Sequence, residues 1–141
     1  MSKMAEIVPI ILEVIEQDKQ FILPVKGTSM CPYLNEKHSV ILEKPLDIKN
    51  KDIILYKRTN GQYVIHRIVG IKDDYYILLG DNQLSKEYPI YKEQVLAKVT
   101  GFIKKDKKIS TKNFLYKLYV FIWSFYIIRK IYFKLRNLLK K

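Results

Sequence analysis

The sequence predicts a mainly β protein: a compact, coiled antiparallel β-sheet of barrel-like shape, with a short N-terminal helix and a basic amphipathic C-terminal helix. Three observations lead to this prediction. Short apolar segments recur from residue 22 to residue 104 with polar turns between them, as in a chain of strands. Helical periodicity occurs only towards the two ends. The length of 141 residues suits one modest core and is too short for two ordinary domains.

The N-terminal segment, residues 1–20, is predicted to be a short helix. Pro9 fits a helix only near its first turn. Glu6, Glu13 and Glu16 interrupt the apolar stretch that a secretory signal needs, so no signal peptide is expected. The apolar residues that recur at helical spacing are Met4, Ile7, Val8, Ile11, Val14 and Ile15.

The central segment, residues 21–106, is predicted to form the β domain. TNG at 59–61 and KDD at 72–74 are typical of hairpin connections, so successive strands are expected to run antiparallel. A composition with 48% hydrophobic and 28% charged residues is that of a globular protein. The predicted strands are 22–26, 40–44, 52–58, 62–71, 75–80 and 95–104.

The C-terminal segment, residues 107–141, differs from the rest of the chain in charge. It carries ten of the 26 basic residues and no acidic one, whereas the remaining 106 residues hold 16 basic and 14 acidic side chains. No Gly or Pro follows Phe114, so a helix is predicted to run on without interruption. On a helical wheel, residues 127–141 divide into an apolar face and a basic face that includes Arg129, Lys130, Lys134 and Arg136.

Such a basic amphipathic helix is typical of segments that bind the surface of an anionic membrane. The aromatic turns before it, which include Trp123, extend the apolar surface. The longest uncharged run, 118–128, has 11 residues, against roughly 20 for a spanning helix. We therefore expect membrane association, with the cytoplasmic leaflet favoured by the positive charge and the side of the membrane left open. Packing onto the domain or a partner is the alternative, and exposed Ile and Leu disfavour nucleic acid.

Three polar residues in the central segment are candidates for catalysis. Ser29 lies in KGTSMCPYL, where Gly27 and Pro32 favour a turn. The turn can serve shape alone, or it can present a nucleophile that needs a base from elsewhere in the chain. His66 lies on the core side of a predicted strand, a common place for a structural histidine, and Asp81 follows a strand in LLGDN, which is ordinary turn chemistry.

Taken in order, the segments GTSMCPYL, KDIILYKR, VIHRIVGI, LLGDN and VLAKVTG resemble the catalytic core of the type I signal peptidase family. The form they resemble is the Ser-His form of the endoplasmic reticulum, archaea and some sporulating bacteria. The resemblance implies that Ser29 is the nucleophile, His66 the general base and Asp81 the acid that orients His66, with Glu87 as the alternative acid. These residue types suit the chemistry, because a neutral imidazole can take a serine proton and a carboxylate can hold its tautomer.

The resemblance also implies an oxyanion site around Gly27, Thr28 and Met30. Members of that family commonly have Ser two residues before the nucleophile, and this chain has Gly27 there. The backbone N–H of Ser29 is therefore expected to carry more of the oxyanion stabilisation. The anchor that usually precedes the nucleophile in the family is not found, so anchoring is expected at the C-terminus.

The expected activity is hydrolysis of an extended segment of a precursor peptide or protein, without a cofactor or a metal. His38 is expected to be a solvated surface residue, and Cys31 a small, partly buried neighbour of the nucleophile. A catalytically silent module that binds a peptide and docks to a membrane is a second interpretation. LexA-type self-cleaving peptidases share Gly-x-Ser-Met, but His66 stands where their Lys is expected and no helix-turn-helix precedes the core. The oligomeric state stays open.

Overall fold

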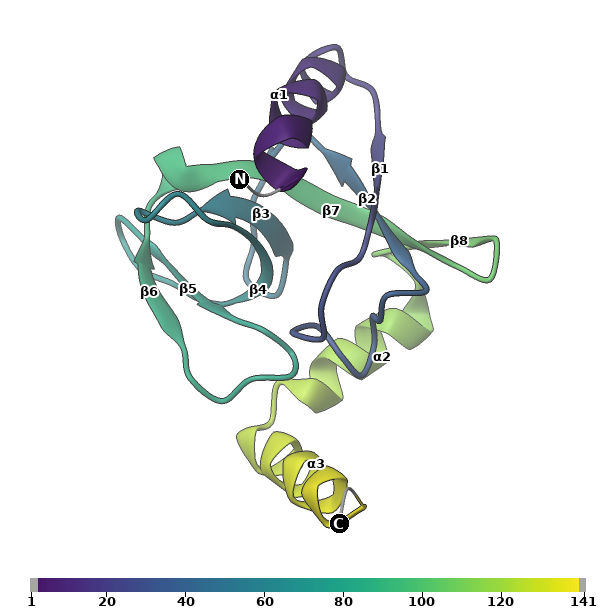
Figure 1. Cartoon of the computed structure of the whole chain (residues 1–141). Helices are drawn as coiled ribbons and strands as arrows, with labels where there is room; N and C mark the ends of the chain where they lie inside the picture. The colour runs from purple at the N-terminus through teal and green to yellow at the C-terminus, as the bar shows by residue number, and fades with distance from the viewer. Residues whose placement is uncertain (1–2, 140–141) are drawn as a thin grey trace. The chain divides into compact units, whose positions relative to one another are not determined.

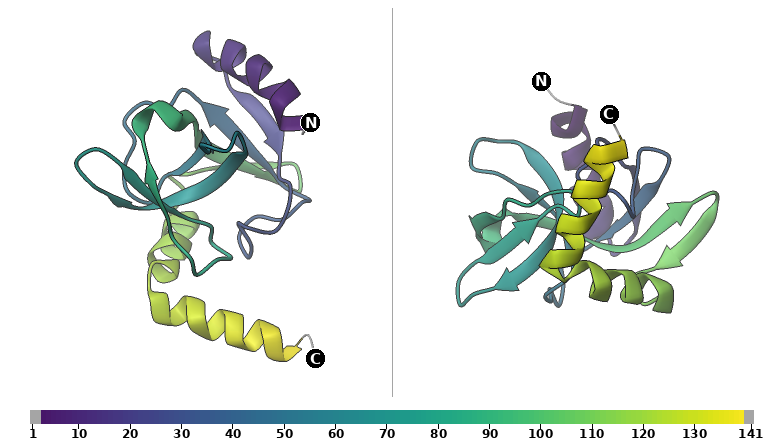
Figure 2. Two further views of the ribbon diagram at one scale, coloured as in Figure 1. Left: turned by 60° about the vertical axis from the view of Figure 1, so that its left-hand side comes forward. Right: turned by 90° about the horizontal axis from the view of Figure 1, so that it is seen from below.

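One antiparallel sheet of eight strands organises the first of the two units into which the chain divides after Thr111 (Figure 1). The computed structural model describes residues 3–139. Figure 2 shows that the sheet coils without closing, with β1 and β6 at its two ends. The strands are β1 (Phe21–Pro24), β2 (Ser39–Glu43), β3 (Ile53–Lys57), β4 (Tyr63–Ile71), β5 (Tyr76–Leu79), β6 (Glu87–Ile90), β7 (Val95–Lys104) and β8 (Lys107–Ser110). The expected fold class is confirmed.

The order of the strands in the sheet is β1-β2-β7-β3-β4-β5-β6, with β8 beside β7. Hairpins join β3 to β4 and β4 to β5, as the turn sequences predicted. The strands β2 and β3 are consecutive in the chain but are not neighbours, because β7 pairs with both of them. The last long strand therefore holds the two halves of the sheet together.

Two strands, β6 and β8, were not predicted from the sequence. The strand β6 is the short edge strand Glu87–Ile90, which contains Pro89. The strand β8 begins at Lys107, within the segment assigned to the C-terminal helix, so that boundary was wrong. Lys105 and Asp106 both have positive φ angles, as a two-residue hairpin turn requires, and this turn returns the chain along β7.

The N-terminal helix α1 (Lys3–Glu16) lies beside β1 and β7 (Figure 1). It buries Val8, Ile11 and Ile15, which belong to the predicted apolar stripe. The helix runs through Pro9, beyond the first turn to which the sequence analysis confined a proline. The helix itself is confirmed.

The core that supports the site lies under β3, β4 and β5. Its apolar cluster is formed by residues that alternate along these strands and point to one face, together with one residue of β6. Tyr56 is fully buried in this cluster although it carries a hydroxyl group, so that group needs a partner inside the protein. The members of the cluster are Ile54, Tyr56, Ile68, Leu78 and Ile90.

The second unit contains two helices, α2 (Phe114–Trp123) and α3 (Tyr126–Leu139), where one continuous helix was predicted. The Asn113 side chain caps α2 by accepting a hydrogen bond from the backbone N–H of Tyr116. At the other end, the Ser124 hydroxyl donates to the carbonyl of Phe121 at 2.6 Å. A serine that bonds to its own backbone competes with helix continuation, which explains the break.

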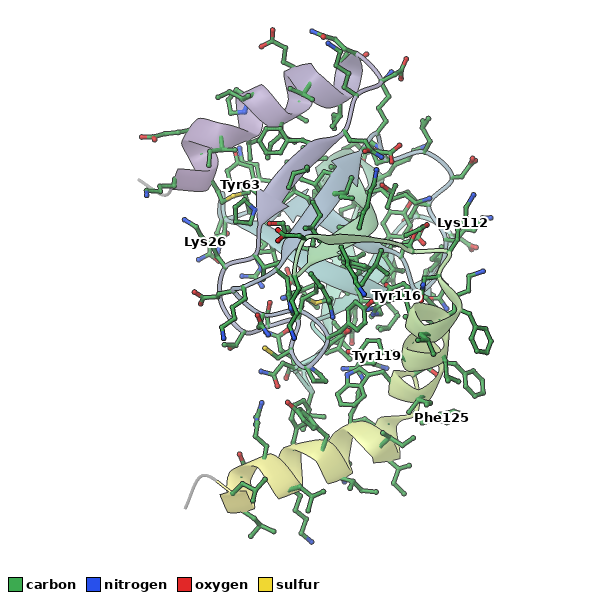
Figure 3. The ribbon with its side chains drawn as sticks, turned by 90° about the vertical axis from the view of Figure 1, so that its right-hand side faces the viewer. Lys26, Tyr63, Lys112, Tyr116, Tyr119 and Phe125 are labelled. Carbon is green, nitrogen blue, oxygen red and sulfur yellow. The ribbon has the colours of Figure 1, made fainter. Side chains whose placement is uncertain are left out.

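The side chains of Trp123 and Arg129 were expected to face a membrane, but both are buried. The guanidinium of Arg129 lies 5.9 Å from the ring of Trp123, and its Nε donates to the Trp123 carbonyl at 2.9 Å. Figure 3 labels Tyr116 and Tyr119 on α2 and Phe125 between the two helices. Trp123 and Arg129 thus join α2 to α3, and Lys130 and Lys134 are the exposed basic residues of α3.

The apolar face of α3 is exposed, as the wheel predicted for a surface-binding helix. Among residues 3–139, no helix is both long enough and apolar enough to cross a membrane. The exposed apolar residues at helical spacing on α3 are Ile127, Ile131, Leu135 and Leu138.

Candidate active site

The turn that carries Ser29 joins β1 to β2. Gly27 has a φ of 77°, in the left-handed region that glycine adopts without strain, so the sequence signal for a turn is confirmed here. The N–H of Cys31 donates to the carbonyl of Thr28 at 3.1 Å and closes the turn around the serine. Met30 is buried and anchors the turn, while Ser29 itself is half-buried.

A second turn, at residues 80–82, holds the Ser29 turn in place. The backbone N–H of Asn82 donates to the carbonyl of Ser29 at 2.9 Å, and its side-chain amide donates to the carbonyl of Thr28, also at 2.9 Å. A Cβ atom on Gly80 would lie 2.7 Å from the Ser29 carbonyl oxygen, so only glycine permits this approach. The Gly-Asp-Asn motif therefore positions the serine through its backbone and its asparagine.

Asp81 lies between Gly80 and Asn82 in this turn, and its carboxylate is fully buried against Arg67. Nε and Nη2 of Arg67 donate to the two carboxylate oxygens at 2.9 Å each, and Nη1 donates to the carbonyl of Lys51 at 2.8 Å. Both side chains are almost inaccessible, at 3% and 0%. This bidentate ion pair ties the turn at 80–82, and with it the Ser29 turn, to β4.

His66 precedes Arg67 on β4 and is itself buried. Successive residues of a strand point to opposite faces, so the ring of His66 faces away from the Arg67–Asp81 pair. Its Nδ1 lies 3.2 Å from the hydroxyl of Tyr56 on the neighbouring strand β3. That hydroxyl donates to Oε1 of Glu87 at 2.9 Å, and Arg58 binds both oxygens of the same carboxylate.

These contacts bear on which acid serves His66. The resemblance to the signal peptidases implied Asp81, with Glu87 as the alternative. In the structure the two oxygens of Asp81 are engaged by Arg67, whereas Glu87 reaches His66 through one hydroxyl group. The geometry favours Glu87, and which of the two acids orients His66 stays a prediction.

Burial lowers the pKa of His66 to about 4, and the Glu87 carboxylate opposes this shift in part. The imidazole is therefore neutral at ordinary pH and can accept a proton. The pKa of Tyr56 is raised, chiefly by burial and also by the hydrogen bond to Glu87, so its hydroxyl stays protonated. Burial by itself raises the pKa of Glu87, but hydrogen bonds from Arg58 and Tyr56 lower it by more than this. The pKa of Glu87 is therefore below its usual value, and the carboxyl is ionised.

Within residues 3–139, no hydrogen bond joins the Ser29 hydroxyl to His66. Catalytic hydrogen bonds are often long in a substrate-free enzyme and tighten in the complex, so the assignment of Ser29 and His66 as a dyad stays a prediction. The backbone N–H of Ser29 likewise has no hydrogen-bond acceptor among these residues, as an oxyanion donor requires.

A cavity of about 400 Å³ opens beside Ser29. Its mostly apolar lining comes from α1, the end of β1, the Ser29 turn and one end of β4, including Ile65 next to His66. Lys26 and Tyr63, which Figure 3 labels on the side below α1, also line it. The cavity is therefore bordered by the turn that bears Ser29 and by residues 63–65 of β4, and His66 is not among its lining residues.

Two further residues singled out from the sequence are His38 and Cys31. His38 is half-buried, and its Nδ1 accepts a hydrogen bond from the backbone N–H of Asn35 at 3.1 Å. Cys31 is a free, half-buried thiol in the turn, as expected. In the described part of the chain, no group of three or more His, Cys, Asp or Glu side chains is placed to hold a metal ion.

A scan against protein families matches residues 2–101 with the Peptidase S24-like family. The chain belongs to the Peptidase S24-like family. Membership implies a serine peptidase of the LexA and signal peptidase type, the coarse function expected from the sequence. It does not single out the signal peptidase form. No curated protein matches the chain.

The part of the chain that matches the Peptidase S24-like family contains both turns and both strands of the candidate site. Three residues of the site were not predicted from the sequence: Tyr56, Arg58 and Asn82. Tyr56 resembles an ordinary strand aromatic, and the role of Asn82 in holding the Ser29 turn was not foreseen. Asn82 was quoted in LLGDN, so its motif carried a signal. In the register of β3 and β4, Ile54 lies opposite His66 and Tyr56 lies opposite Val64, so Tyr56 contacts His66 diagonally on the same face of the sheet.

Asp81→Asn tests the ion pair. We expect it to lower the free energy of unfolding by about 3–5 kcal/mol, because it leaves the buried guanidinium of Arg67 without a charged partner. Urea unfolding measures this change, and amide hydrogen exchange at residues 28–31 should speed up as the turn loosens. Asp74→Asn, at an exposed turn position, is the control and should change neither. A stability equal to that of the wild type would contradict the structural role of Asp81.

His66 gives a prediction about pH. We expect its ring to stay neutral in the folded chain down to about pH 4. Between about pH 6.5 and pH 4 the unfolded chain binds a proton here that the folded chain does not, so stability falls as the pH falls through this window. NMR titration of the ring and urea unfolding at each pH measure both effects. A folded-state pKa near 6.5 would contradict the burial argument.

Proposed function

We propose that the protein is a membrane-associated serine endopeptidase of the signal peptidase type, which cleaves an extended segment of a precursor peptide or protein. The observation that supports this most is the apolar cavity that is lined by the Ser29 turn and by residues 63–65 of β4, the strand that also carries His66. A peptide in extended form can lie along it and place its scissile carbonyl near Ser29. The apolar lining suits the small side chains before the cleavage site that the family resemblance implies.

In the proposed mechanism Ser29 Oγ attacks the scissile carbonyl carbon while Nε2 of His66 takes the hydroxyl proton. The negative charge on the carbonyl oxygen is stabilised by the N–H of Ser29, because Gly27 offers no hydroxyl group. The imidazolium then gives the proton to the departing amine, which leaves an acyl-enzyme. Water activated by the same imidazole hydrolyses the ester and restores Ser29. No step needs a metal or a cofactor.

Ser29→Ala tests the nucleophile. We expect it to abolish cleavage of a peptide library incubated with the full chain and analysed by mass spectrometry, while the circular dichroism spectrum is unchanged. Ser85→Ala, at an exposed position on another loop, should cleave like the wild type. Equal cleavage by Ser29→Ala and the wild type would contradict the proposal.

A catalytically silent module is the second candidate, and the absence of a hydrogen bond between Ser29 and His66 favours it. Such a module would bind peptides in the same cavity without cutting them. If the wild type binds library peptides that it does not cleave, and Ser29→Ala keeps both that binding and the cellular function, this candidate replaces the enzyme.

The proposed membrane association depends on α3, whose exposed residues include Ile131, Leu135, Lys130 and Lys134. An exposed apolar stripe flanked by lysines suits the interface of an anionic bilayer. The cytoplasmic leaflet, which is negatively charged, is the surface that this chemistry favours.

Vesicle binding tests this association. We expect the full chain to sediment with anionic vesicles and not with neutral ones, and salt to weaken the binding. Lys130→Gln together with Lys134→Gln should reduce the affinity roughly 30-fold, at about 1 kcal/mol for each lysine. Lys72→Gln with Lys92→Gln, two exposed lysines of the first unit, is the control. Equal binding to neutral vesicles would contradict the electrostatic part of the proposal.

A further inference from the structure

The hydroxyl of Tyr56 bridges His66 and Glu87 inside the protein, and the mechanism above does not use it. It lies 3.2 Å from Nδ1 of His66 and 2.9 Å from Oε1 of Glu87. Tyr56 is fully buried, with a relative accessible surface of 0%, and the relative accessible surface of His66 is 3%. Water therefore does not compete for this hydroxyl, and its two contacts decide where its single proton lies.

The direction of both hydrogen bonds follows from counting donors. The Glu87 carboxylate is ionised and can only accept, and Arg58 donates to both of its oxygens at 2.9 Å. The hydroxyl of Tyr56 has one proton, and the shorter contact to a charged acceptor takes it. The oxygen of Tyr56 is then an acceptor towards His66, so Nδ1 of the ring must be the donor.

We propose that Glu87, acting through the Tyr56 hydroxyl, holds His66 as the tautomer protonated at Nδ1 and leaves Nε2 as the atom that accepts the Ser29 proton. Tyr56 and Glu87 are positioning residues in this arrangement. The acceptance of the Ser29 proton by Nε2 rests on the proposed peptidase function, whereas the tautomer of His66 does not.

The same chain of contacts favours the imidazolium that forms during the reaction. When Nε2 takes the proton, the Nδ1–H remains bonded to the Tyr56 oxygen, whose hydroxyl still points to the Glu87 carboxylate. No proton moves to Glu87. The negative charge of Glu87 raises the pKa of His66, against the larger effect of burial, and the positive charge of Arg58 limits this gain.

The hydroxyl can also turn round, which makes the arrangement testable. In Glu87→Ala the Tyr56 hydroxyl loses its acceptor and is free to donate to Nδ1 instead. The ring proton then lies on Nε2, and the nitrogen that should act as the base is blocked. In Tyr56→Phe the bridge is absent, so nothing fixes Nδ1 as the protonated atom. Glu87→Gln keeps one oxygen that can accept from the hydroxyl, but it removes the charge and replaces the other oxygen, which accepts from Arg58 Nε, by an NH2 group.

The first experiment is nitrogen-15 NMR of the His66 ring in the full chain at neutral pH. We expect a protonated Nδ1 and an unprotonated Nε2 in the wild type and in Glu87→Gln. Glu87→Ala should show the proton on Nε2, and Tyr56→Phe a mixture. The controls are Tyr76→Phe, a tyrosine packed against the same core cluster without a bond to His66, and Glu93→Ala, an exposed carboxylate. Both should match the wild type.

The second experiment is the kinetics of peptide cleavage. Glu87→Ala should lower kcat roughly 100-fold with KM unchanged, the lower end of what general base catalysis contributes. Glu87→Gln should retain much of this activity. A wild-type ring protonated at Nε2, or a tautomer that neither Glu87→Ala nor Tyr56→Phe alters, would overturn the proposal. Full activity in Glu87→Ala despite an altered tautomer would also overturn it. A wild type that cleaves nothing yet shows the expected nitrogen signals defeats the peptidase function alone.

Discussion

The ion pair between Arg67 and Asp81 is the constraint on which the site depends. Burying two charges costs several kcal/mol for each ion, and only good geometry with further hydrogen bonds offsets that cost. Here the Arg67 guanidinium donates two parallel hydrogen bonds to the Asp81 carboxylate, and its remaining nitrogen donates to the backbone carbonyl of Lys51. A pair of this kind fixes position more than it adds stability. It locks the turn at 80–82, and Asn82 in that turn binds the carbonyls of Thr28 and Ser29, which lie on either side of the Ser29 Cα atom.

The alternation of β4 separates this structural task from the chemical one. Arg67 points to one face and binds Asp81, while His66 points to the other and meets Tyr56. The two acids therefore serve different residues: one places the serine turn and the other sets the state of the imidazole. Burial keeps the imidazole neutral, and the contacts with Tyr56 and Glu87 decide which nitrogen is free. Two adjacent residues of one strand thus have separate tasks, because Arg67 holds the two turns and His66 faces the Tyr56 hydroxyl.

Much of this could be predicted from the sequence, because alternation and turn residues are local signals. The strands β4 and β7 were predicted almost to the residue, and Ser29, His66 and the Gly-Asp-Asn turn were recognised together. The pairing of β7 with both β2 and β3 was not, since it depends on long-range packing. The edge strand β6 carries Pro89, which reads as a strand breaker, and β8 carries lysines that read as part of the tail. The sequence did not decide between Asp81 and Glu87 as the acid that serves His66, because Tyr56, which links His66 to Glu87, looks like any other core aromatic.

A crystal structure of the full chain tests the central claim most directly. We expect Asp81 to bind Arg67 through both oxygens and Asn82 to contact the carbonyls of Thr28 and Ser29. We also expect a bound substrate-like peptide to bring Ser29 Oγ within about 3.2 Å of Nε2 of His66. A peptide seated in the cavity with Ser29 Oγ out of reach of the ring, or Asp81 bonded to His66 instead of Arg67, would contradict it.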